Sequence, residues 1–166
     1  MATLQRILVG TDLSEVSPAL YALAHALARQ SGARLVVAYV ADPGEYDELR
    51  RERPMGVDEF IERFRATILL DFEDATDGAQ PAQVVVRMRQ RGVAEDLLQI
   101  ASDVEADLVV VGTHGRTGLR RVLLGSVAEA VMRHATTPVL VVPHAVASRF
   151  APAARAAPTT AGGSAT

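Results

Sequence analysis

Hydrophobic residues form two kinds of pattern along this chain, and the two kinds alternate. The first is a short, continuous run of apolar and mostly β-branched residues, which is typical of a parallel strand that helices cover on both faces. Five such runs occur, at residues 7–9, 35–40, 84–86, 108–111 and 139–142. We expect each run to form one strand of a parallel sheet.

The second kind is an apolar stripe whose residues recur every three or four positions, as on one face of an amphipathic helix. Four stripes lie between the runs: Leu20, Leu23 and Leu27; Phe60, Phe64, Ile68 and Phe72; Val93, Leu97, Ile100, Ala101 and Val104; and Val127, Ala130, Val131 and His134. Ser17 and Pro18 precede the first stripe and predict a helix cap followed by a first-turn proline.

This alternation of strands and helices predicts the fold class. Right-handed crossovers give an α/β fold with a doubly wound, five-stranded parallel sheet, strand order 3-2-1-4-5 and helices on both faces, which is Rossmann-like. We assign the domain to residues 1–144. Residues 145–166 are rich in Ala, Pro, Gly and Thr, and we expect a disordered tail there. The connection at residues 41–56 is long and highly charged, and we expect it to be a loop that can cover a ligand.

Composition narrows the class of function. The 166-residue chain has a formal net charge of -3, which argues against nonspecific nucleic-acid binding. It has no cysteine and all 17 basic residues are arginine, which excludes a thiolate nucleophile, a Schiff base and a lysine-containing phosphate loop. No apolar run is long enough to span a bilayer, and the opening MATLQRILVGTD does not resemble a signal peptide. We therefore expect a cytoplasmic protein without membrane insertion.

The candidate chemistry lies where two strands end. Ligands of open α/β sheets bind outside the carboxyl ends of the strands, where the winding direction reverses. In the expected strand order, Asp12 and Gly112 flank that crevice. Gly112, Gly115 and Gly118 can take positive φ, so that backbone N–H groups can approach an anion closely.

The helix that follows this loop adds a second feature. Gly125 precedes Ser126 and Glu129, whose S-x-x-E spacing matches a capping box, and the free N–H groups of a helix start suit a phosphate. The residues alone leave two interpretations open: a phosphate cradle, or an ordinary strand-to-helix connection in which Ser126 only caps its helix. Neither a Walker loop nor a G-x-G-x-x-G fingerprint is present.

These residues carry a resemblance to a known family. Gly112-x-x-Gly115, followed by nine residues and then Gly125-Ser126, is similar to the G-2x-G-9x-G-[ST] nucleotide-binding signature of the universal stress protein family. The flanking segments ILVGTD, GVAEDLLQIASDVEADLVVVGTHGR and TTPVLVVP also resemble that family. The similarity extends over about residues 4 to 143 and favours the phosphate cradle.

The resemblance implies an adenine-nucleotide site that takes ATP, with Mg²⁺ bound through the phosphates. The positions that match the family's site are Gly10, Asp12, Val40, Gly112, Thr113, His114, Gly115, Arg116, Thr117, Gly118, Gly125, Ser126, Val127 and Ala128. Two of them depart from some ATP-binding relatives. Gly10 replaces a proline, which would loosen that wall, and Ala128 replaces a hydroxyl residue, which would remove one phosphate hydrogen bond.

Several residues keep alternative interpretations. Asp12 either meets a ribose, an adenine edge or a phosphate-bound magnesium ion, or caps its local turn. Arg116, Arg120 and Arg121 either neutralise phosphates or form a solvated run. His114 is expected to place its backbone near the ligand rather than act as a base. We assign no catalytic residue and no metal ligand.

The sequence thus predicts an ATP-binding regulatory protein of the stress response, which acts through nucleotide-dependent conformation or through a protein partner that the sequence does not identify. Slow ATP hydrolysis, sensing of AMP or cyclic AMP, and a structural dimer with a vestigial site stay open. The last strand, residues 139–142, falls at a sheet edge with free backbone groups between two prolines. We therefore expect a homodimer paired through it.

Overall fold

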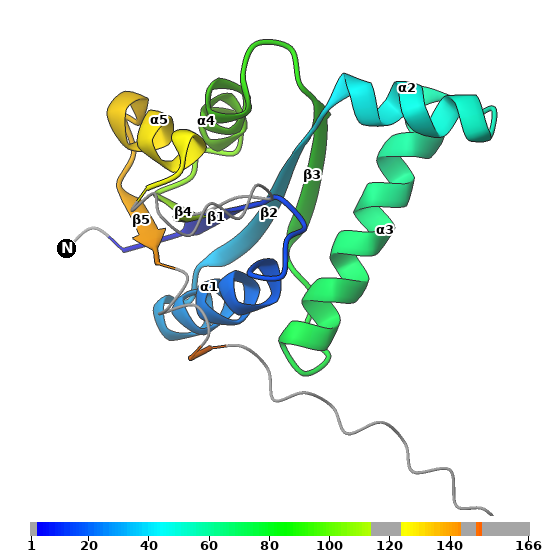
Figure 1. Cartoon of the computed structure of the whole chain (residues 1–166). Helices are drawn as coiled ribbons and strands as arrows, with labels where there is room; N and C mark the ends of the chain where they lie inside the picture. Colours follow the sequence, from blue (N-terminus) through cyan, green and yellow to red (C-terminus); the bar gives the residue numbers. More distant parts are fainter. Residues whose placement is uncertain (1–2, 114–123, 144–148, 151–166) are drawn as a thin grey trace, which may run out of the picture.

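The computed structural model describes residues 3–113, 124–143 and 149–150. Five strands form one parallel sheet in the order β3-β2-β1-β4-β5, as the sequence predicts (Figure 1). The strands are β1 (Arg6–Thr11), β2 (Arg34–Ala41), β3 (Gln83–Met88), β4 (Leu108–Gly112) and β5 (Val139–Val142). β1 is central, with Val9 opposite Val37 of β2 and Val110 of β4. The winding therefore reverses between β1 and β4.

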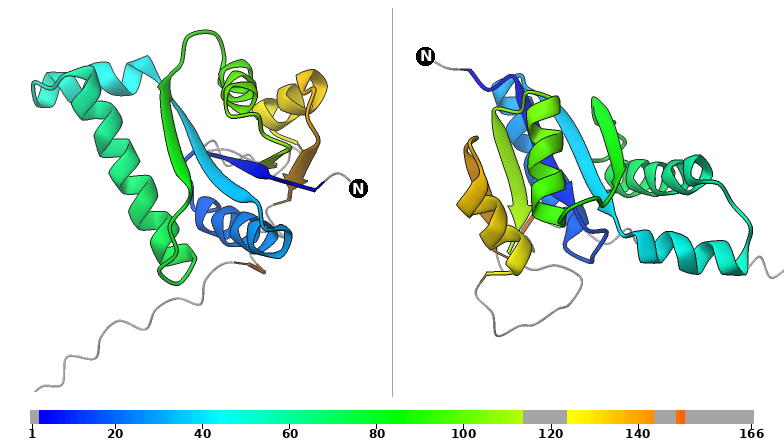
Figure 2. Two further views of the ribbon diagram at one scale, coloured as in Figure 1. Left: turned by 180° about the vertical axis from the view of Figure 1, so that it is seen from behind. Right: turned by 90° about the horizontal axis from the view of Figure 1, so that it is seen from above.

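Helices cover both faces of this sheet, as Figure 2 shows from two further sides. α1 (Ser17–Ser31) and α3 (Val57–Ala75) pack on one face, and α4 (Val93–Asp103) and α5 (Ser126–His134) pack on the other. Successive side chains of a strand point to opposite faces. Ile7 and Val9 therefore join the core under α1 and α3, whereas Leu8 joins the core under α4 and α5.

One predicted loop is a helix. Residues 41–56 contain α2 (Pro43–Glu52), so the expectation of a loop there is wrong. Asp42 caps this helix by accepting a hydrogen bond from the Gly44 N–H at 2.7 Å, and Pro43 occupies the first turn. The helix was missed because it is mostly charged and buries no residue fully, which leaves almost no hydrophobic period to detect.

Two further findings concern the chain as a whole. Among the described residues, no helix is long and apolar enough to cross a membrane. The predicted tail at 145–166 lies outside the described residues except at positions 149 and 150.

Candidate functional site

A cavity of about 340 Å³ opens at the carboxyl ends of β1, β2 and β4 and at the first turns of α4 and α5. Its volume is in the range of sites for small molecules. It lies where the winding of the sheet reverses, which is the position expected for a ligand in this fold class. Its lining residues are Gly10, Thr11, Asp12, Leu20, Ala38, Tyr39, Val40, Asp42, Val93, Leu97, Val111, Gly112, Thr113, Gly125, Ser126, Val127 and Ala128.

The cavity brings together the predicted site residues that the structure describes. These are Gly10, Asp12, Val40, Gly112, Thr113, Gly125, Ser126, Val127 and Ala128. The other predicted site residues lie outside the described residues: His114, Gly115, Arg116, Thr117 and Gly118, together with Arg120 and Arg121. Chain segments more than 80 residues apart in sequence therefore meet at one site.

Asp12 holds its local turn with one carboxylate oxygen and leaves the other free. Oδ1 accepts hydrogen bonds from the Ser14 N–H at 3.1 Å and from the Ser17 hydroxyl at 3.3 Å. Oδ2 is buried and has no hydrogen-bond partner among the described residues. Because a buried polar atom without a partner is unfavourable, this oxygen suits a donor supplied by a ligand. The turn-capping interpretation therefore accounts for Oδ1 alone.

Gly10 is a point of close packing between β1 and α4. A Cβ atom at this position would lie 2.8 Å from Cδ2 of Leu97 and 3.4 Å from Cγ1 of Val111. The expectation that glycine loosens this wall is therefore wrong, because the Leu97 side chain occupies the space. The sequence placed Leu97 on the apolar stripe of its helix, but not against Gly10.

One side of the cavity is apolar. Val40, Val93, Leu97 and Val111 line it, and Val93 is 38% exposed although it is large and hydrophobic. Sequence analysis assigned only Val40 of these to the site. Strand and helix periodicity indicated that the others are apolar, but it could not show that they border a cavity rather than fill the core.

The start of α5 differs from its prediction. Gly125 is the N-cap, with φ -73° and ψ 154°, and Ser126 is the first helical residue rather than the cap. The capping-box prediction is wrong, because Glu129 forms an ion pair with Arg133 at 2.6 Å. No side chain of the described residues caps this helix. The N–H groups of residues 126–128 thus begin a helix at the cavity wall, where the helix dipole favours an anion.

Of the glycines predicted to be able to take positive φ, Gly112 is the one that the structure describes, and it does not take it. Gly112 is the last residue of β4, in register with Val142, and is not among the described residues with positive φ. Gly125 has a φ that any residue can adopt. A requirement for positive φ therefore explains neither of them.

The helix start at residues 17 and 18 is shifted by one position from its prediction. Val16 is the N-cap of α1, Ser17 is the first helical residue, and the proline follows in the first turn. The Ser17 hydroxyl contacts Thr11 and Asp12 instead of capping the helix. Sequence analysis did not assign Thr11 or Ser17 to the site, because neither belongs to the signature.

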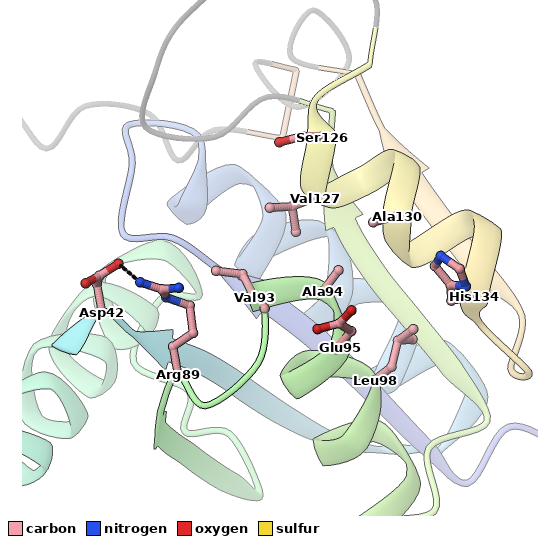
Figure 3. Close-up of a pocket in the computed structure, with 11 residues that line it drawn as sticks. Asp42, Arg89, Val93, Ala94, Glu95, Leu98, Ser126, Val127, Ala130 and His134 are labelled. Carbon is pink, nitrogen blue, oxygen red and sulfur yellow. Dashed lines mark hydrogen bonds and ion pairs between the residues drawn. The ribbon is translucent and has the colours of Figure 1, made fainter. Parts of the chain in front are cut away.

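A second hollow of about 400 Å³ continues from the cavity along α4 and α5. The two share Asp42, Val93, Ser126 and Val127. Figure 3 shows the ion pair between Asp42 and Arg89, at 2.7 Å, to one side of Val93. Sequence analysis did not predict this extension.

A family model and a curated relative match this chain over most of its length. The model of the universal stress protein family matches residues 3–143. Universal stress protein MJ0531 of Methanocaldococcus jannaschii is 33% identical over 141 residues, which cover 83% of this chain and 81% of that protein.

Solved structures match the fold with similar coverage. One match is a crystal structure of a universal stress protein in complex with cAMP, which is 29% identical in sequence to this chain and has a TM-score of 0.60. The match covers 86% of this chain and 99% of that protein. The structure of protein MJ0577 of M. jannaschii is 28% identical with a TM-score of 0.65, and 86% of this chain covers 97% of it.

Proposed function

The chain belongs to the universal stress protein family, and from that premise we propose that it is an ATP-binding regulatory protein of the stress response. It acts through a nucleotide-dependent conformation or through a partner that recognises the nucleotide-bound form. The cavity described above is the nucleotide site, and the family signature assigns residues 114–118 to the same site.

One observation carries this proposal. Asp12, whose buried Oδ2 has no hydrogen-bond partner among the described residues, and the start of α5, which no side chain of the described residues caps, line the same cavity. A carboxylate oxygen accepts hydrogen bonds, so it suits a sugar hydroxyl. A helix N-terminus offers N–H donors and a positive dipole end, so it suits a phosphate. A nucleotide is a ligand that supplies both groups at once.

The base, which is the third part of a nucleotide, suits the apolar side of the cavity. Val40, Val93 and Leu97 offer a hydrophobic surface on which a planar base would bury its faces. Asp42 lies at the same side, where the strand β2 ends. Base, sugar and phosphates would thus each meet the chemistry they require.

We assign ATP as the ligand on the family signature, with Mg²⁺ bound to the phosphates rather than to a cluster of side chains. A relative at 29% identity was crystallised with cAMP, which makes cyclic AMP the second candidate. We propose binding rather than turnover, because the chain has no lysine and the described residues of the cavity include no evident pair of base and nucleophile.

Ser126→Asp tests the phosphate end of this proposal. The added carboxylate lies at the first residue of α5, where it would repel a phosphate but favour the helix dipole. We therefore expect ATP affinity to fall at least about tenfold, while the free energy of unfolding stays equal or rises by up to about 1 kcal/mol. Isothermal titration calorimetry and urea unfolding measure the two quantities.

The neutral variant Ser126→Asn is the matched control and should keep most of the ATP affinity. Adenosine, which has no phosphate, should bind wild type and Ser126→Asp equally. Thermal unfolding of the wild type with ATP, AMP and cyclic AMP ranks the ligands, and ATP at about 100 times its Kd should add roughly 2.7 kcal/mol. Absence of any shift with all three nucleotides would refute the nucleotide site.

We also propose that the protein is a homodimer paired through β5. The carbonyls of Pro138 and Val142 accept hydrogen bonds from Val109 and Thr113 of β4 and its end. Because backbone groups of a strand alternate in direction, the N–H and C=O groups of Val139 and Val141 face away from β4. A second copy related by a two-fold axis can pair with them.

A further inference from the structure

Behind Asp12, three hydroxyl groups form a continuous chain of hydrogen bonds. Tyr21 contacts Oγ1 of Thr11 at 2.7 Å, Thr11 contacts Oγ of Ser17 at 2.9 Å, and Ser17 contacts Oδ1 of Asp12 at 3.3 Å. The chain links the end of β1 to the first turns of α1. Its three bonds join residues five to ten positions apart, and none of the three hydroxyl residues belongs to the nucleotide-binding signature.

The carboxylate of Asp12, at one end of this hydrogen-bond chain, determines which group donates and which accepts in every bond. A carboxylate can only accept, so the single proton of the Ser17 hydroxyl is donated to Asp12. Ser17 must then accept from Thr11, and Thr11 must accept from Tyr21. The Leu13 N–H also donates to Thr11 Oγ1, at 3.2 Å, which leaves the Thr11 proton for Ser17. All three hydroxyl donors are thus aligned toward one oxygen of Asp12.

Burial keeps this alignment in place. Tyr21 is fully buried, Ser17 is 1% exposed and Thr11 is 9% exposed, so water has little access to compete for their protons. Burial also raises the pKa of the Tyr21 hydroxyl well above its ordinary value, which keeps the first donor protonated. Hydrogen bonds in such a shielded chain reinforce one another.

The consequence is an asymmetric carboxylate. Ser17 Oγ and the Ser14 N–H both bind Oδ1, whereas Oδ2 stays without a partner among the described residues. Asp12 and Thr11 both line the cavity. The hydrogen-bond chain therefore fixes the rotation of the Asp12 carboxylate and leaves Oδ2 as the oxygen that can accept from a further donor.

We propose that Ser17, aligned by Thr11 and Tyr21, is a positioning residue that makes the site selective for ribonucleotides over deoxyribonucleotides. It does so by holding Asp12 so that Oδ2 accepts a hydrogen bond from a hydroxyl of the ribose. The inference rests on the proposed nucleotide site and adds to it the property that sets its sugar specificity. A site that hydrogen-bonds a substrate hydroxyl rejects the analogue that lacks it, because its own polar atom is left unpaired.

The experiment compares ATP, 2′-deoxy-ATP and 3′-deoxy-ATP by isothermal titration calorimetry on wild type and on Ser17→Ala. Wild type should bind ATP about 10- to 100-fold more tightly than at least one deoxy analogue, as expected for a lost hydrogen bond to a charged group. In Ser17→Ala this ratio should fall at least about threefold, while the affinity for that deoxy analogue changes little. A fall in the ratio is a result that loss of stability alone would not produce.

Ser14→Ala is the matched control. It removes a hydroxyl from the same turn, and that hydroxyl is buried without a partner among the described residues. Its backbone N–H still donates to Asp12, so the ATP to deoxy-ATP ratio should stay at the wild-type value. Tyr21→Phe removes the first donor of the chain, keeps the shape of the ring, and should lower the ratio less than Ser17→Ala does.

Three results would overturn the inference. If wild type binds ATP and both deoxy analogues equally, the sugar is not selected, although the proposed nucleotide site stands. If Ser17→Ala weakens all three ligands by the same factor, Ser17 has only a structural role. If wild type binds none of the three, the inference falls together with the proposed function. If Ser17→Ala does not fold, the ratio of ATP affinity to deoxy-ATP affinity is measured in Tyr21→Phe instead. An unchanged ratio in that variant refutes the role of the hydrogen-bond chain.

Discussion

At the level of single residues, Gly10 and Asp12 have different roles at the end of β1: Gly10 allows close packing, and Asp12 provides a polar group. Gly10 has no side chain, so Leu97 of α4 reaches the strand and closes the cavity floor. Asp12 uses one oxygen to hold its turn, and the other has no hydrogen-bond partner in the part of the chain that the structure describes. The wall and the polar anchor of the cavity thus come from neighbouring positions of one strand end.

The first prediction concerns Gly10→Ala. The added Cβ would approach Cδ2 of Leu97 at 2.8 Å, and because this atom is the end of a flexible side chain, Leu97 will turn away. We expect the free energy of unfolding to fall by no more than about 2 kcal/mol. ATP affinity should fall about tenfold, equivalent to 1.4 kcal/mol, because Leu97 lines the cavity and its displacement reshapes the floor.

Urea unfolding and calorimetric titration with ATP check these two values. Gly56→Ala is the control, because a Cβ atom there meets nothing within 4 Å and the φ of -80° suits alanine. Gly56 precedes α3 and does not line the cavity. Unchanged ATP affinity in Gly10→Ala would show that Leu97 does not shape the ligand site.

At the scale of secondary structure, the connection between β3 and α4 depends on a buried carboxylate. Asp96 of α4 is 2% exposed and accepts hydrogen bonds from the N–H groups of Gln90 and Arg91, at 2.7 and 3.2 Å. This connection leads into Gly92, which lines the second hollow, and Val93, which lines both hollows. Asp96 thus folds the loop back onto the helix that follows it.

Asp96 also makes the stability of the protein depend on pH. Desolvation alone would raise the pKa of this carboxyl, but the hydrogen bonds from Gln90 and Arg91 and the charge of Arg91 together hold its pKa below the ordinary value. A lowered pKa in the folded state means that the stabilisation is present above the pKa of the unfolded chain. It is lost as the pH falls through the folded pKa.

We therefore expect Asp96→Asn to lower the free energy of unfolding at neutral pH by about 1–3 kcal/mol, because the amide weakens two charge-assisted hydrogen bonds. The difference from wild type should begin to shrink below about pH 4, the ordinary pKa of an aspartate in the unfolded chain, and it is lost once the pH has fallen through the lower pKa of the folded state. Urea unfolding across this pH range measures both effects. Asp47→Asn, at an exposed position of α2, is the control, and a constant difference for Asp96→Asn at every pH would contradict the assignment.

At the scale of the whole molecule, β5 is an edge strand, because no described strand pairs with its outer side. The outward N–H of Val141 takes no part in the pairing with β4, where Val142 and Pro138 provide the acceptors. Val141→Pro removes that outward donor without breaking a β4–β5 hydrogen bond. We expect light scattering at micromolar concentration to show a monomer for the variant and a dimer for wild type.

Val141→Thr is the matched control for this prediction. Threonine keeps the β-branched shape and the backbone N–H, so the variant should remain a dimer. A wild-type monomer would refute the dimer, and a dimeric Val141→Pro protein would place the interface away from β5.

The fold, and the chain segments that meet at the site, could be predicted from the order of strands and helices along the chain. Residues 35–40 read as a strand and residues 60–72 as a helix because a strand and an amphipathic helix repeat at different periods. Right-handed crossovers then fixed the sheet order, which the structure confirms. These rules act on neighbouring residues or on all proteins of the class, so no knowledge of distant contacts was needed.

Only the tertiary structure decided how individual side chains are used. The sequence could not show that Leu97 fills the space beside Gly10, or that Ser17 turns its hydroxyl toward Asp12. The hydrophobic pattern also did not predict α2, because this helix is marked in the sequence by its capping residue and first-turn proline and not by a hydrophobic period. Such details depend on packing between segments that are far apart in sequence. A hydroxyl or methyl group contacts whichever partner the folded core places beside it, and local sequence does not specify that partner.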